Sequence, residues 1–216
     1  MTTHQINIRG GSARIIHAVS TFSEATMEPE CGVGLRHDGA GLLAYATDKR
    51  RTAFIKAPLE TPTLRPHDAP ALSVNLPIDA VACIYEATRH VAHDYRPFTL
   101  TFDMVDTYPS LLRGNAPGTW EFSSPIDGVL GYGDLLPLSD LPTVLQEFPL
   151  GYLEPVHTLI SMERLQALRT ADRRAHAKGR PWEIGTGLQP PATGLPSLVC
   201  RSSWSTVVIP PHPLTY

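Results

Sequence analysis

Basic side chains recur at helical spacing in three separate segments of the sequence. In the third segment, intervals of four, three and four residues place the cations on one face of a predicted helix. The cations and histidines of the three segments are Arg14 and His17; Arg89, His93 and Arg96; and Arg169, Arg173, Arg174, His176, Lys178 and Arg180. One such stripe is usually a solvated helix face. Three stripes favour contact with phosphate groups, because a phosphate-facing surface uses many separate cations rather than one pocket.

Residue patterns that would indicate an enzyme are weaker than these basic stripes. His90 and His93 are three residues apart and could share a metal ion, but the sequence offers no third ligand of matching placement, which favours surface histidines. The turns GYGDL and RGGS lack the lysine and the spacing of a phosphate loop, and no GxSxG motif is present. Asp127 and Asp134 each lie beside glycine, as turn-forming aspartates do. The sequence therefore predicts no catalytic residue, no bound metal and no cofactor.

The composition is that of an ordinary globular protein. The chain has 216 residues, 42% of them hydrophobic, and a formal net charge of −3, so it can bury a core and is not a uniformly basic nucleic-acid binder. Cys31, Cys83 and Cys200 are widely separated without CxxC spacing, which argues against disulfides and zinc. No apolar run reaches the length of a membrane span, and the first residues lack a signal-peptide pattern. We expect a reduced, cytoplasmic compartment and no membrane contact.

The pattern of apolar and turn residues predicts helices that alternate with antiparallel strands. Helices are expected over residues 13–24 with Ser12 as N-cap, over 78–94, and over 162–178 with Ser161 as N-cap and Gly179 as the stop. Strands are expected within 31–56, 71–77, 96–105, 105–136 and 204–211. A Pro-rich connector runs from Pro58 to Pro70, and residues 138–148 could form a short helix but carry Pro142 near its start. A helix followed by several strands thus recurs at least twice.

Four segments, in this order, resemble the bacterial DNA polymerase sliding clamp, the β-type processivity factor. GLLAYATDKRRTAF is similar to a strand-turn segment of that family, with Ala46, Thr47, Asp48, Arg51 and Ala53 matching and Lys49, Arg50 and Thr52 departing. ALSVNLPIDAVACIYEA resembles a strand and helix of the family. FSSPIDGVLGYGDLLP resembles its inter-domain segment, and WSTVVIPPHPL its last strand and tail.

The resemblance implies an α+β protein with the DNA clamp fold, which is not an enzyme and encircles duplex DNA without reading its sequence. It implies a clamp domain over residues 1–137 and a shortened second one over 138–216. DNA would contact the basic residues of the three helices, His17 excepted. A pocket for short peptide motifs of DNA polymerases and clamp loaders would comprise Thr47, Asp48, Lys49, Arg50, Arg51, Thr52, Pro137, Val207, Val208, Ile209 and Pro210. Copies of the chain would close a nucleoid-associated ring, a trimer if a fourth unit is hidden in the sequence and a tetramer if not.

Two alternatives remain open at the level of sequence. Residues 178–187, KGRPWEIGTG, resemble a stretch of fumarylacetoacetate hydrolase-like, metal-dependent enzymes, although the E-x-E strand that holds their metal is absent. A monomeric adaptor with a clamp-like fold, which binds a polymerase without encircling DNA, is the other alternative.

Overall fold

The computed structural model describes residues 2–23, 32–37, 42–48, 53–59, 72–89, 98–104, 117–137, 162–177, 181–186 and 198–209. Two units of the same order open the chain. The first contains β1 (Thr2–Ile8), α1 (Gly10–Ser20), β2 (Val33–His37), β3 (Leu42–Asp48) and β4 (Ala53–Leu59). The second contains β5 (Leu72–Leu76), α2 (Ile78–Thr88), β6 (Phe98–Met104), β7 (Gly118–Ser124) and β8 (Gly128–Asp134). A further group comprises α4 (Met162–Arg174), β9 (Glu183–Thr186), β10 (Leu198–Arg201) and β11 (Thr206–Ile209).

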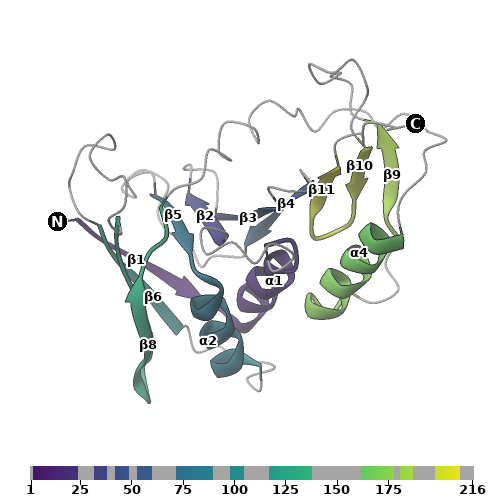
Figure 1. The fold of residues 1–216 in the computed structure, drawn as a ribbon. Coiled ribbons are helices and arrows are strands. Elements are labelled where there is room, and N and C mark those ends of the chain that lie inside the picture. The colour runs from purple at the N-terminus through teal and green to yellow at the C-terminus, as the bar shows by residue number, and fades with distance from the viewer. Residues whose placement is uncertain are drawn as a thin grey trace.

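The first two units exchange the strand that precedes each helix. β1 of the first unit pairs with β6 of the second, and β5 of the second pairs with β2 of the first, both antiparallel. The result is a four-stranded sheet of order β1-β6-β7-β8 and a seven-stranded sheet of order β5-β2-β3-β4-β11-β10-β9. The third group joins the larger sheet because β11 pairs with the edge of β4 (Figure 1). One continuous sheet therefore links the first unit to the last.

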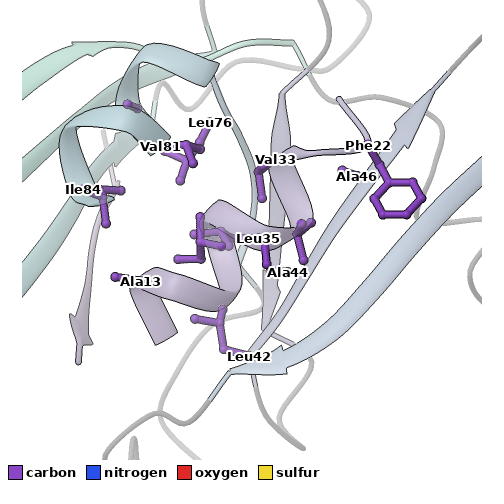
Figure 2. Close-up of a cluster of buried hydrophobic side chains, with 14 of the residues drawn as sticks. Ala13, Phe22, Val33, Leu35, Leu42, Ala44, Ala46, Leu76, Val81 and Ile84 are labelled. Carbon is purple, nitrogen blue, oxygen red and sulfur yellow. The ribbon is translucent and has the colours of Figure 1, made fainter. Parts of the chain in front are cut away.

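The core lies between these sheets and the helices. Strands with one buried face alternate apolar and polar residues, as β6 and β7 do, and their apolar sides meet the apolar stripes of α1 and α2. Figure 2 shows Ala13 of α1 and Ile84 of α2 near Leu35 and Ala44 of the larger sheet. Each fully buried leucine or isoleucine side chain contributes about 1.5–3 kcal/mol by leaving water. Burial of the helix stripes thus fixes which helix faces remain outside.

The strand predictions over residues 31–56, 71–77, 96–105 and 204–211 are confirmed by β2, β3, β4, β5, β6 and β11, and β7 and β8 lie within 105–136. The sequence pattern does not predict β1. The predicted cap of the first helix is wrong: the helix begins at Gly10 with Arg9 as N-cap, and Ser12 is buried inside the first turn. The chain turns from β1 into α1 within one residue, so no room remains for a cap at position 12. The helix also ends at Ser20, before Glu24.

The end of α4 differs from the prediction as well. His176 adopts a left-handed conformation with φ of 57°, its N–H donates to the Arg173 carbonyl, and the Ala177 N–H donates to the Asp172 carbonyl. These two hydrogen bonds form a Schellman motif, which ends the helix at Arg174, ahead of Lys178 and Gly179. α2 ends at Thr88, followed by its C-cap residue Arg89, and the predicted continuation over 90–94 lies outside the described residues. Ser161 and residues 138–148 also lie outside them.

Candidate nucleic-acid interface

The three described helices form one layer in the order α2, α1, α4 (Figure 1). His17 of α1 stacks on Tyr85 of α2 with ring centroids 3.8 Å apart. The two residues hold the same place in their units, because each is the eighth residue of an 11-residue helix. On the other side of α1, the Arg174 guanidinium donates to the Thr21 hydroxyl over 3.1 Å. Aromatic stacking and a charge-assisted hydrogen bond therefore hold the helix layer together.

α4 presents cations on its exposed side. Arg169 and Arg173 are exposed and one turn apart, and His176 is exposed just beyond the helix. The opposite side of α4 is apolar, since Leu168 and Ala171 are buried in the core. On α1 the half-buried Arg14 adds a further cation to the layer. Arg169, Arg173 and His176 are therefore the members of the predicted basic stripe that are exposed at α4.

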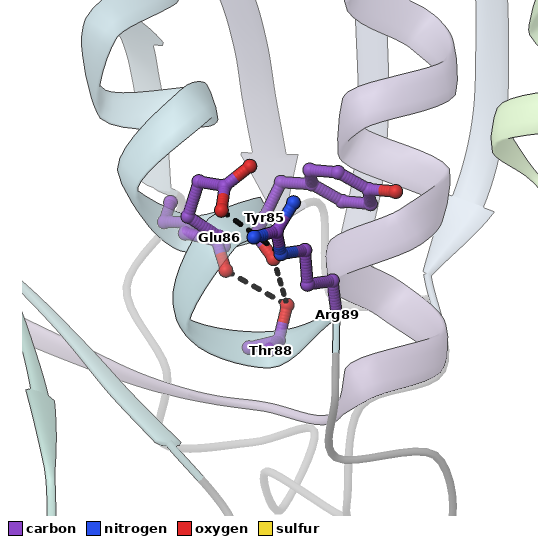
Figure 3. A network of polar contacts seen from close by, with 5 residues as sticks. Tyr85, Glu86, Thr88 and Arg89 are labelled. Carbon is purple, nitrogen blue, oxygen red and sulfur yellow. Dashed lines mark hydrogen bonds and ion pairs between the residues drawn. The ribbon is translucent and has the colours of Figure 1, made fainter.

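Two predicted cations have partners inside the protein. Arg174 is half-buried and donates to the hydroxyl oxygens of Ser20 at 3.5 Å and Thr21 at 3.1 Å, so it joins α4 to α1. Arg89 lies at the end of α2, where its Nε is 2.9 Å from a carboxylate oxygen of Glu86 (Figure 3). His93, Arg96, Lys178 and Arg180 lie outside the described residues.

The outer face of the four-stranded sheet has the opposite charge. Its strands contain neither lysine nor arginine. In the register of the sheet, Thr3, Asp103, Thr119 and Asp134 form one row across the four strands, and Glu121 lies in the next row. Exposed arginines thus lie on α4, whereas the four-stranded sheet carries carboxylates and neither lysine nor arginine. Such a distribution directs a polyanion to the helices.

A carboxylate on α4, which the sequence pattern does not mark, anchors this helix to the last strands. Asp172 accepts the indole N–H of Trp182 at 2.6 Å on one oxygen and that of Trp204 at 3.0 Å on the other. The two indole rings meet edge to face with centroids 6.1 Å apart. Asp172 is adjacent to Arg173, so this anchor fixes the rotation of the helix that carries the exposed arginines. No local signal could have found it, because Trp204 is 32 residues away.

The predicted peptide pocket is brought together in part. β3, β4 and β11 are neighbours, and Phe54 is paired with Thr47 on one side and Val208 on the other, so the ends of these strands meet at one junction. Val207, Val208 and Ile209 are buried there. Pro137 lies elsewhere: its carbonyl accepts from the Asn75 side chain at 3.1 Å, beside β5, and β2 and β3 separate β5 from β4. Lys49, Arg50, Arg51, Thr52 and Pro210 lie outside the described residues.

Burial perturbs three titratable groups. It raises the pKa of the Cys200 thiol to about 11, and it raises the pKa of the half-buried Cys83 thiol. Burial also raises the pKa of the Tyr45 phenol, against the opposing effects of the nearby Ser73 side chain and the charge of Arg36. None of the three shifts favours the reactive, charged form. Among the described residues no group of three or more His, Cys, Asp or Glu side chains is placed to hold a metal ion. In the same part of the chain no helix is long and apolar enough to cross a membrane.

No protein-family model matches the sequence, and no curated protein matches it. Solved structures do match. The DNA polymerase III beta subunit from Thermotoga maritima superimposes with a TM-score of 0.51 and 8% sequence identity, over 97% of this chain and 64% of that one. The DNA polymerase III subunit beta from Pseudomonas aeruginosa gives a TM-score of 0.50 with 9% identity, over 97% and 64%. The sliding clamp from Bartonella birtlesii, solved with bound griselimycin, gives 0.52 with 9% identity, over 100% and 66%.

The chain has the DNA clamp fold. It spans slightly less than two thirds of the length of these beta subunits. In the stretch that resembles fumarylacetoacetate hydrolase-like enzymes, Trp182 binds Asp172, and Glu183–Thr186 form β9 at the end of the seven-stranded sheet.

Proposed function

We propose that the protein is a sliding clamp, a processivity factor that encircles duplex DNA and tethers a DNA polymerase to it. The observation that carries the proposal is the placement of charge within a clamp fold: exposed arginines on α4, and carboxylates without lysine or arginine on the four-stranded sheet. A surface that slides on DNA needs separate phosphate contacts without base readout. Arg169, Arg173 and His176 meet this requirement, with Arg14 beside them on α1.

The other parts of the proposal follow from the same fold. The helix layer of several copies would line the hole of a closed trimer or tetramer. His93, Arg96, Lys178 and Arg180 would extend the cationic lining. Arg174 would act indirectly, by holding α4 against α1, and Arg89 would contribute less because Glu86 neutralises it.

The junction of β3, β4 and β11 would bind the short peptide motifs of a polymerase or a clamp loader, and the clamp from Bartonella birtlesii has griselimycin bound. Because Val207, Val208 and Ile209 are buried, they would form the floor of this pocket rather than its rim. The residues around Lys49–Thr52 and Pro210 would then supply the polar contacts. Pro137 would act from a distance, by fixing where the chain leaves the first domain.

The test compares two double neutralisations of equal charge. Arg169→Gln with Arg173→Gln removes two cations from the helix layer, and Arg36→Gln with Arg201→Gln removes two from the seven-stranded sheet. Binding to duplex DNA is measured by fluorescence anisotropy over a range of salt concentrations. Removing one phosphate-binding cation lowers the slope of log K against log salt by about 0.9. We expect the slope to fall by about 1.8 per protomer in the helix variant and to stay unchanged in the sheet variant. Equal changes in the two variants would refute the assignment of the helix layer.

A further inference from the structure

Tyr45 lies on the outer face of the seven-stranded sheet, opposite to the helix layer. Its neighbours in β3, Ala44 and Ala46, belong to the core beneath the helices, and successive side chains of a strand point to opposite faces of the sheet. Tyr45 is only 2% exposed, although it does not belong to that core. A phenol is therefore buried on the face of the sheet that the helices do not cover.

The Tyr45 ring reaches across β2 at Gly34. The two residues are paired in the sheet, and a Cβ on Gly34 would collide with the far end of the ring, with Cζ as the nearest atom. Because Cζ carries the hydroxyl, glycine at position 34 is what lets this group pass over β2. On its other side Gly34 is paired with Asn75 of β5. The hydroxyl is thus carried from β3 toward β5.

Two further polar side chains lie beside this hydroxyl. Arg36 of β2 and Ser73 of β5 are paired with each other in the adjacent row of the sheet, and both are half-buried. The Ser73 side chain and the charge of Arg36 both act on the Tyr45 phenol, where they oppose the rise in pKa that burial causes. Two hydroxyl groups and a guanidinium group therefore lie together on this face.

The Tyr45 hydroxyl has no hydrogen-bond partner among the residues that the structure describes. Ser73 lies near it without completing a hydrogen bond. A buried tyrosine hydroxyl usually has a partner, and burying one without a partner is unfavourable. Since both hydroxyl groups and the guanidinium can donate, the group that completes the site is an acceptor, and Arg36 favours a negative charge on it.

The site shares β3 with the junction of β3, β4 and β11. Tyr45 precedes Thr47 by two residues, and Thr47 is in one row with Phe54 and Val208. Val208 is therefore three strands and one row away from Gly34. With strands about 4.8 Å apart and rows about 6.7 Å apart, this distance is about 16 Å, which an extended peptide covers with about five residues. A peptide at the junction can thus reach the site.

We propose that Tyr45, Arg36 and Ser73 bind a carboxylate of the peptide whose apolar residues occupy the junction of β3, β4 and β11. Tyr45 and Ser73 donate their hydroxyl protons to the carboxylate oxygens, and Arg36 balances the charge. The half-buried Arg36 and Ser73 form the accessible part of the site, and the phenol lies at its base. This inference deepens the proposed function and rests on it, because it names the partner's chemistry: an acidic residue about five positions from the apolar ones.

The test compares two labelled peptides. In the first, two central leucines are followed and preceded by an aspartate five residues away, with glycine and serine between, and its twin carries asparagine instead. Binding is measured by fluorescence anisotropy at low salt. Tyr45→Phe and Arg36→Gln alter the site. The matched controls are Tyr132→Phe, which removes an exposed hydroxyl from the four-stranded sheet, and Arg201→Gln, which removes a cation from β10.

We expect the aspartate peptide to bind at least tenfold more tightly than its twin, which is the size of one hydrogen bond to a charged group. Tyr45→Phe and Arg36→Gln should each weaken binding of the aspartate peptide about tenfold, whereas both controls should bind it as the unaltered chain does. Equal affinity for the two peptides would overturn this inference alone. Failure of both peptides to bind would overturn it and would also contradict the peptide junction of the proposed function.

Two further measurements test the site itself. Without peptide, Tyr45→Phe should keep or raise the midpoint of urea unfolding, because its hydroxyl makes no internal hydrogen bond. A lower midpoint would overturn the proposal. A single-stranded oligonucleotide should not displace the aspartate peptide from the unaltered chain. Displacement that Arg36→Gln abolishes would assign the site to a phosphate of nucleic acid and would overturn the assignment to a carboxylate.

Discussion

Replacing Asp172 with asparagine tests the anchor that orients α4. Each carboxylate oxygen of Asp172 accepts one indole N–H, from Trp182 at 2.6 Å and from Trp204 at 3.0 Å. Asparagine keeps one acceptor and turns the other into an NH₂ donor, which then faces an indole donor. The substitution changes volume very little, so its effect reports on hydrogen bonding.

The magnitude follows from the two bonds. A hydrogen bond to a charged group contributes about 1.5–3 kcal/mol, and a buried donor left without an acceptor costs about 1–3 kcal/mol. Trp204 is buried and Trp182 is half-buried. We therefore expect Asp172→Asn to lower the free energy of unfolding by about 2 kcal/mol and Asp172→Ala to lower it by about 4 kcal/mol.

The assay is urea unfolding, monitored by far-UV circular dichroism and by tryptophan fluorescence. Trp182 and Trp204 are two of the three tryptophans of the chain. Trp182→Phe and Trp204→Phe, each alone and combined with Asp172→Asn, complete two double-mutant cycles, in which we expect coupling of about 1–2 kcal/mol. Asp103→Asn is the control, because Asp103 bonds the Thr3 hydroxyl on the exposed face of the four-stranded sheet. A loss for Asp172→Asn no larger than that of the control would refute the reasoning.

Three further predictions concern positions outside this anchor. The Tyr45 ring occupies the space where a Cβ on Gly34 would lie, so Gly34→Ala should lower the free energy of unfolding by about 3 kcal/mol in urea titrations, and Tyr45→Ala should cost less in the Gly34→Ala background than it does alone. His176→Gly should raise the free energy of unfolding by about 1 kcal/mol because it relieves a left-handed residue, whereas Thr170→Gly inside α4 should lower it by roughly 0.3 kcal/mol. The pKa of Cys200 rises from 9.0 to about 11 on folding. The contribution of this thiol to the free energy of unfolding is therefore fully present below pH 9 and is lost as the pH rises through 11, a loss of roughly 3 kcal/mol. Cys200→Ala should make stability depend less on pH in this range, and identical pH profiles would contradict the burial of this thiol.

Periodicity predicts the elements whose apolar residues meet the core within one unit. The strands within 31–56 and the helix that begins at Ile78 alternate or repeat regularly, so their local pattern identifies them. β1 lacks such a local signal because its partner residues in β6 lie 90 to 102 positions away, and only Ile6 and Ile8 mark its buried side. The end of α4 lacks one too, since a left-handed histidine terminates the helix where glycine is the usual residue.

The site shows the same division between local and distant information. Helical spacing predicts that Arg169 and Arg173 share a face, and both are exposed on α4. Helical spacing does not reveal that Arg174, unlike Arg169 and Arg173, bonds to another helix, because its acceptor Thr21 is 153 residues away in the sequence. Charge count likewise gives a net −3 without revealing that the four-stranded sheet carries carboxylates and neither lysine nor arginine.

Topological retention on DNA tests the central claim most directly. Protomers are dissociated by dilution, mixed with closed circular duplex DNA, concentrated to reassemble, and passed through a sizing column in salt high enough to abolish phosphate contacts. A ring that encircles DNA should stay with the circle and leave it as soon as one restriction cut makes the DNA linear. Equal loss from circular and linear DNA would contradict encirclement.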